Sequence, residues 1–322
     1  MTTTFITNLQ KNYDRVVNYF GTGQSQRFVV SLACHFTLEN KQFSGVLLNK
    51  VMDKIITESK SLPLQYESAI SYKIALKLMN TENLEESIVQ LNERDRVLQK
   101  NGFKKSPSRV IGGLFLQGDI TLHAKRAKML FDAMNQRQRF LTTNEDIPYV
   151  VIMTVEENQN PSLRADTIVR YYQGLKSQKF ILGNHLQALS QIMTIYSEEY
   201  NEILLNYVIQ LRNVLLNRNV KVRRIHYPFI GILAMASTNE EKIEEMVEFY
   251  NLLIKLKPFR MEIELALIVA IQKTIRDLSY IQSAVDMGPL SNFDKLLFTA
   301  DFVLEILSNA SGGFGVVFDL FQ

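Results

Sequence analysis

The sequence predicts an all-α fold with no β-sheet, an α-solenoid of about seven to eight stacked antiparallel helical hairpins of the HEAT or tetratricopeptide kind. Three observations predict it. One hydrophobic position recurs about every forty residues along the chain, and the segments between these positions show helical periodicity. Glycine and proline number only 14 and 7 among 322 residues, which favours helices over a turn-rich β protein.

The recurring hydrophobic positions mark the turn inside each hairpin. They are spaced by 37 to 42 residues and comprise Phe20, Leu62, Phe103, Phe140, Phe180, Val220 and Phe259. Twelve residues further on, each copy again has an apolar residue, and in the last four copies it is Ile152, Ile192, Ile232 or Ile271. We expect these isoleucines to be buried, because a single hairpin can bury its apolar face only against its neighbours.

The copy that contains Phe180 shows how the sequence specifies a hairpin. Residues 162–180 place apolar side chains on one helical face, including Ile168, Tyr172 and Leu175. Gly183 is then a signal for the end of this helix, and Asn184 can cap the next one. Proline is tolerated in a helix only in its first turn, so Pro148 and Pro228 place the start of their helices near residues 146 and 226.

The C-terminal part departs from this pattern. Residues 273–286 read as another first helix, residues 287–289 as its turn and residues 292–308 as a closing helix. We therefore predict one continuous helical-repeat domain over residues 1–310 and an apolar, glycine-rich tail over residues 311–322. The tail is expected to pack against the last hairpin or, alternatively, to dock onto a partner.

Composition excludes several classes of protein. Apolar residues make up 46% of the chain, enough for a packed core, and the net charge of +3 is small for a dedicated nucleic-acid binder. Cys34 is the only cysteine, so no internal disulfide can form and a reducing cytoplasmic location is expected. No apolar run is long enough to span a membrane.

Two short segments carry a family resemblance: residues 140–146, FLTTNED, and residues 183–187, GNHLQ. With the size and helical content of the chain, they resemble a bacterial family catalogued as domain of unknown function 4003. The resemblance implies a bacterial cytosolic helical protein and supplies no catalytic residue.

Histidine and cysteine positions suggest chemistry only weakly. Cys34 and His35 are adjacent, but neighbours on a helix point about 100° apart, so Cys34 is predicted to be an inert buried residue. His185 and His226 occupy similar places in neighbouring copies, near Asp146, yet helices about 8–10 Å apart are too widely spaced to share one ion. With no catalytic motif present, we predict no catalytic residue, cofactor or metal site.

Charge follows the predicted repeat. Basic residues gather in the turn inside each hairpin, and glutamates gather in the loops between hairpins. The predicted basic edge comprises Arg137, Arg139, Lys176, Lys179, Arg218, Lys221, Arg223 and Arg224. Solvation of helix ends explains such a pattern without function, since cations suit helix C-termini.

The functional hypothesis is a non-catalytic helical-repeat scaffold that binds a protein partner through this edge. Two alternatives stay open. One is an RNA- or nucleotide-associated regulator that uses the basic edge. The other is an enzyme with a pocket in a concave groove, because catalytic groups need proximity only in space.

Overall fold

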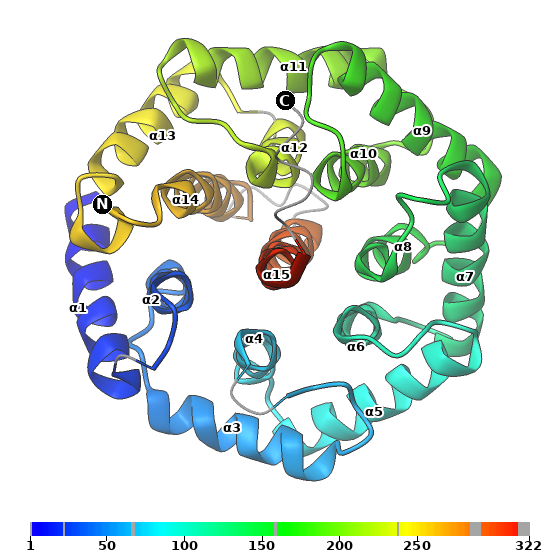
Figure 1. The fold of residues 1–322 in the computed structure, drawn as a ribbon, viewed down its shortest axis with the longest axis horizontal. Helices are drawn as coiled ribbons and strands as arrows, with labels where there is room; N and C mark the ends of the chain where they lie inside the picture. The colour runs from blue at the N-terminus through cyan, green and yellow to red at the C-terminus, as the bar shows by residue number, and fades with distance from the viewer. Residues whose placement is uncertain are drawn as a thin grey trace. The chain divides into compact units, whose positions relative to one another are not determined.

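The computed structural model describes residues 2–21, 23–65, 68–157, 160–236, 238–283 and 291–314. Over these residues the chain forms fifteen α-helices and three short 3-10 helices, with no strand (Figure 1). The predicted all-α class is therefore confirmed. None of the described helices is both long and apolar enough to cross a bilayer.

The first fourteen α-helices follow one another as seven pairs, the first helix of each pair odd-numbered and the second even-numbered. The pairs are α1 (Thr2–Phe20) with α2 (Gln26–Leu38), α3 (Gly45–Glu58) with α4 (Ala69–Leu78), α5 (Leu84–Lys100) with α6 (Pro107–Phe115), α7 (Ile120–Arg137) with α8 (Ile147–Met153), α9 (Pro161–Ser177) with α10 (Asn184–Tyr196), α11 (Glu202–Asn217) with α12 (Tyr227–Met235), and α13 (Glu240–Leu253) with α14 (Ile263–Ser283). The 3-10 helices η1 (Asn144–Asp146), η2 (Arg224–His226) and η3 (Lys257–Phe259) precede α8, α12 and α14, and α15 (Ser291–Phe314) follows the pairs.

Contacts divide the chain into two compact units, each assembled from two segments. Unit 1 is Met1–Leu47 with Glu202–Asp294, and unit 2 is Leu48–Asn201 with Lys295–Gln322. The predicted single domain over residues 1–310 stays a prediction.

In unit 2, the first helices of successive pairs pack against one another, and so do the second helices. Helix α7 packs against α5 and α9, while α8 packs against α6 and α10. In Figure 1 the helices α5, α7 and α9 lie across the view, while α6, α8 and α10 are seen nearly end on. Helix α15 contacts α4 through an ion pair between Asp301 and Lys73, and α6 through the rings of Phe298 and Phe115.

Unit 1 joins the two ends of the series of pairs. Helix α2 packs against α14 and η3, although more than 200 residues separate them in the chain. The rings of Phe5 and Phe249 meet edge to face, with centroids 5.2 Å apart, and Arg276 donates a hydrogen bond to the carbonyl oxygen of Leu38. In a linear solenoid the first and last hairpins would not touch, so the stacking order expected from the sequence does not hold for the first pair.

The even-numbered helices are buried on nearly every side. All seven residues of α8 are buried, as are the consecutive residues 227–234 of α12 and 186–194 of α10. The odd-numbered helices instead bury one apolar stripe, as in α11, where Leu204, Val208, Leu211 and Leu215 are buried. The expected burial of the four isoleucines is confirmed, with Ile152 7% exposed and the other three 0%.

The recurring turn positions differ in burial, and Phe140 is 95% exposed. After α5, α9 and α11, a residue in the left-handed region turns the chain, and the N–H of the next residue bonds to the carbonyl five residues earlier. This C-terminal cap buries Phe103, Phe180 and Val220. No residue between 138 and 143 has a positive φ, so the chain leaves α7 differently and Phe140 faces solvent.

The C-terminal expectations are also revised. Residues 263–283 form one unbroken helix, so the predicted start of a new helix at Lys273 is wrong. Helix α15 continues to Phe314, six residues beyond the predicted end of the closing helix. The predicted turn at 287–289 and most of the tail, residues 315–322, lie outside the described residues.

A buried ion pair fastens α5 to α6. Arg109 donates two parallel hydrogen bonds to Asp95, with Nε–Oδ1 and Nη2–Oδ2 both 2.8 Å, and a third to the carbonyl oxygen of Phe103 at 3.1 Å. The side chains are 2% and 3% exposed. Such a pair stabilises the fold little compared with apolar residues in its place, but removing one partner leaves the other charge buried without a counter-charge.

We expect Asp95→Ala to lower the free energy of unfolding by about 3–5 kcal/mol, because Arg109 would be left buried without a carboxylate. Urea unfolding followed by circular dichroism measures this. The matched control is Glu85→Gln, which breaks an exposed ion pair with Lys54 and should change stability little. Equal losses in the two variants would contradict the account.

Candidate functional site

Three arginines of the predicted basic edge are held by carboxylates of the helical pair that follows them in the chain. Arg137, at the end of α7, binds Asp166 of α9, and Arg218, after α11, binds Glu244 of α13. Arg223 binds Glu264 of α14. These ion pairs hold the pKa of Asp166 and of Glu244 below the usual value, chiefly through the arginine hydrogen bond. The positive charge of each of these arginines is therefore at least partly neutralised by a carboxylate of the same chain.

The other five residues of that edge differ. No ion pair joins Arg139, Lys176, Lys179, Lys221 or Arg224 to a carboxylate in the described part of the chain, and all five are exposed. The structure thus separates the predicted edge into a paired set and an unpaired set.

In unit 2 the unpaired cations lie among exposed apolar side chains. Four cations and three apolar residues in the turns after α5, α7 and α9 form what we call the turn surface. They are Lys104, Lys105, Arg139, Phe140, Lys179, Ile181 and Leu182. Ile181 is 46% exposed and Leu182 is 49% exposed, beside the nearly bare Phe140. No acidic residue lies between positions 101 and 106, 138 and 143, or 178 and 183.

Buried polar contacts bring these three turns to one side of unit 2. His123 of α7 contacts both Gln117, just after α6, and Val151, near the end of α8. Arg164 of α9 contacts Met153, the last residue of α8, and Glu198, just after α10. The C-termini of α6, α8 and α10 therefore lie together, and the turns that lead into their N-termini lie together at the other end.

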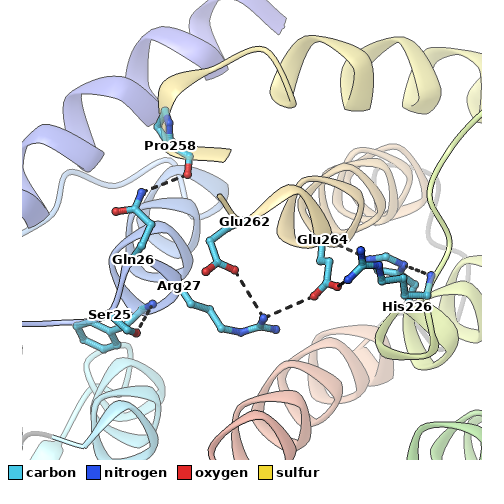
Figure 2. A network of polar contacts seen from close by, with 9 residues as sticks. Ser25, Gln26, Arg27, His226, Pro258, Glu262 and Glu264 are labelled. Carbon is cyan, nitrogen blue, oxygen red and sulfur yellow. Dashed lines mark hydrogen bonds and ion pairs between the residues drawn. The ribbon is translucent and has the colours of Figure 1, made fainter. Parts of the chain in front are cut away.

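A second polar network lies in unit 1, where the first pair meets the last (Figure 2). Arg27, at the start of α2, approaches Glu262 at 3.7 Å and Glu264 at 3.8 Å. Glu264 also receives Arg223, so one carboxylate lies between two guanidinium groups. Gln26 donates a hydrogen bond of 3.3 Å to the carbonyl oxygen of Pro258, which ties α2 to η3. Every charge in this network has a counter-charge, which suits a structural clamp.

His226, a candidate metal ligand in the sequence, belongs to the same network (Figure 2). Its Nδ1 accepts the backbone N–H of Arg223 at 2.8 Å, so the hydrogen must be on Nε2, which donates to the carbonyl oxygen of Glu264 at 3.0 Å. The other predicted candidate, His185, is half-buried at the start of α10. Among the described side chains, no group of three or more His, Cys, Asp or Glu residues is arranged to hold a metal ion.

Cys34 lies inside α2 and is 3% exposed, as expected from its apolar surroundings. His35, one position along the helix, is half-buried. Burial keeps the thiol from reagents in water, which fits a packing role.

A buried polar cluster joins η1 and α8 to α10. Asp146 accepts a hydrogen bond from the backbone N–H of Thr143 at 2.7 Å and one from Nε2 of Gln191 at 2.5 Å. The hydroxyl of Tyr149 and both amide atoms of Gln187 are buried without a protein partner. Burial raises the pKa of Asp146 to about 7, while its two hydrogen bonds act in the opposite direction.

Sequence reasoning located Asp146 but missed its partner Gln191 and the nearby buried Gln187. A signal was present, since Gln187 and Gln191 are four apart in a helix and so share one face. It also missed the exposure of Phe140, for which the sequence has no local sign.

Comparison with known proteins identifies a family and no relative of known structure. Residues 12–284, most of the chain, match the family described as "Protein of unknown function (DUF4003)", and the chain belongs to that family. No curated protein and no solved structure matches the chain.

We expect the buried carboxyl of Asp146 to make stability depend on pH. Its pKa of about 7 in the folded chain exceeds the value near 3.9 of an unfolded aspartate, so the folded state holds the proton more tightly. The stabilisation is present below about pH 4 and is lost as the pH rises to 7, by roughly 3–4 kcal/mol.

Urea unfolding of the wild type and of Asp146→Asn between pH 4 and 8 measures this effect. The wild type should lose stability relative to the variant as the pH rises. Glu199→Gln, a change at an exposed carboxylate, serves as the control and should leave the pH profile unchanged. A wild type that gains stability over Asp146→Asn with rising pH would show that the folded chain prefers the carboxylate.

Proposed function

We propose that this chain, as a member of the DUF4003 family, is a non-catalytic helical-repeat scaffold that binds a protein partner through the turn surface of unit 2. The observation that carries the proposal is Phe140, 95% exposed, in a turn with the unpaired cation Arg139. We further propose a bacterial cytoplasmic location, supported by the lone buried cysteine, Cys34.

Exposed aromatic and basic side chains are typical of interfaces. Phenylalanine and arginine are enriched in interface cores, and covering a large apolar side chain is worth about 1.5–3 kcal/mol. Phe140 contributes nothing to its own core, so its stabilising role would come only from a partner. Ile181 and Leu182, in the neighbouring turn, extend the same apolar surface.

Charge selects the chemistry of that partner. The turn surface has four cations, Lys104, Lys105, Arg139 and Lys179, and no acidic residue lies in 101–106, 138–143 or 178–183, although Glu145 and Asp146 follow in η1. An acidic protein segment with apolar side chains would complement it, because opposite charges steer association and suppress wrong partners. RNA would satisfy the cations but would leave Ile181 and Leu182 uncovered.

The test places a photo-crosslinking amino acid at position 140 and, separately, at position 182. After irradiation in the native cells, we expect both positions to give the same protein adduct. The matched control is position 89 of α5, where Val89 is 64% exposed in the same unit but lies away from the turns. It should not give that adduct.

A second variant tests the role of charge. Arg139→Glu with Lys179→Glu, carrying the crosslinker at position 140, should lose most of the adduct, while circular dichroism shows an intact fold. An adduct that nuclease digests would overturn the protein partner in favour of nucleic acid. Equal adducts at positions 140 and 89 would overturn the surface itself.

A further inference from the structure

A polar pocket lies in unit 1, between α1 and the end of α2. Its volume is about 250 Å³. The residues that line it are Asn8, Lys11, Asn12, Arg15, Thr37, Asn40, Lys41 and Gln42. Three of these are cations, four are amides, one is a hydroxyl, and none is a carboxylate.

The floor of the pocket is rigid. Asn12 is 2% exposed, and its Nδ2 donates hydrogen bonds of 3.0 Å to Oγ1 of Thr37 and to the carbonyl oxygen of Lys41. Its Oδ1 accepts the backbone N–H of Phe43 at 2.9 Å. One buried amide therefore fixes the chain after α2 against α1, which sets the backbone positions from which the lining side chains extend.

Arg15 differs from the other arginines of unit 1 that this structure pairs. Arg27, Arg218 and Arg276 each contact a glutamate. Within the described part of the chain no carboxylate forms an ion pair with Arg15, which contacts the amide oxygen of Gln42 at 2.6 Å from Nη1 when that oxygen is oriented toward the guanidinium. A neutral oxygen accepts the hydrogen bonds but leaves the positive charge uncompensated.

The acid that precedes the lining residues Asn40 and Lys41 in the sequence is already paired. Glu39, beside the pocket in sequence, binds Arg276 at 2.6 Å. Its pKa is below the usual value because Arg276, His35 and Lys41 outweigh the effect of burial. Lys41 therefore interacts electrostatically with Glu39, while Lys11 and Arg15 are the other two cations that line the pocket.

We propose that this pocket binds a small phosphate-bearing anion. Multiple cations with no acid among the lining residues favour a multiply charged oxyanion, and a guanidinium offers paired donors that match phosphate oxygens. The amides of Asn8 and Asn40 supply further donors. The volume of about 250 Å³ suits a phosphate or diphosphate group and is smaller than most drug-sized pockets.

Isothermal titration calorimetry of the full chain tests the proposal, with pyrophosphate as the probe, in a phosphate-free buffer at constant ionic strength. We expect saturable binding to one site, and about tenfold weaker binding in Arg15→Gln, because one charged donor pair is lost. Lys11→Gln, at an exposed position, should weaken binding as well and provides a second variant if Arg15→Gln fails to fold.

The matched control is Lys255→Gln, an exposed lysine of unit 1 outside the pocket, which should bind pyrophosphate like the wild type. Titration with ADP distinguishes the source of the anion. Tighter binding than pyrophosphate indicates a phosphate carried on a nucleoside, and equal or weaker binding indicates a free inorganic anion. No saturable binding, or equal weakening in Lys255→Gln, would overturn the proposal.

Discussion

The even-numbered helices α6, α8 and α12 are short and buried on nearly all sides, so their terminal backbone groups must find hydrogen-bond partners inside the protein. A helix leaves four N–H groups and four carbonyl groups unpaired at its ends, and in the interior water cannot serve them. Polar side chains of the odd-numbered helices supply the partners. His123 accepts the N–H of Gln117 and donates to Val151, and Arg126 donates to the carbonyl oxygens of Thr154 and Val155. Polar side chains such as His123 and Arg126 therefore fix the packing of successive pairs.

The same requirement explains what the sequence could and could not predict. Hydrophobic spacing and the positions of Pro148 and Pro228 depend on local geometry, and they correctly placed the isoleucine core and the starts of α8 and α12. The exposure of Phe140 could not be predicted, because Arg139 and Lys179 both precede an aromatic residue, yet only Lys179 adopts the left-handed conformation. Likewise, the Asp95–Arg109 pair joins residues whose proximity depends on how α5 and α6 pack.

Pairing of charges separates structural residues from candidates for function. Arg137, Arg218 and Arg223 belonged to the predicted basic edge, but each binds a carboxylate of a later helix. Sequence shows the sum of charges in a turn and not their partners, so it could not divide this set. The cations without such partners, at the turn surface and at Arg15, are the ones on which the functional proposals rest.

The central claim is that buried histidines serve backbone groups at helix ends in one fixed tautomer. A long-range proton–nitrogen correlation spectrum of the imidazole rings tests it most directly. The account predicts that His123 and His226 both carry their hydrogen on Nε2. It also predicts that His123 stays neutral below the usual range, because burial lowers its pKa. A hydrogen on Nδ1 in either ring, or ordinary titration of His123, would contradict it.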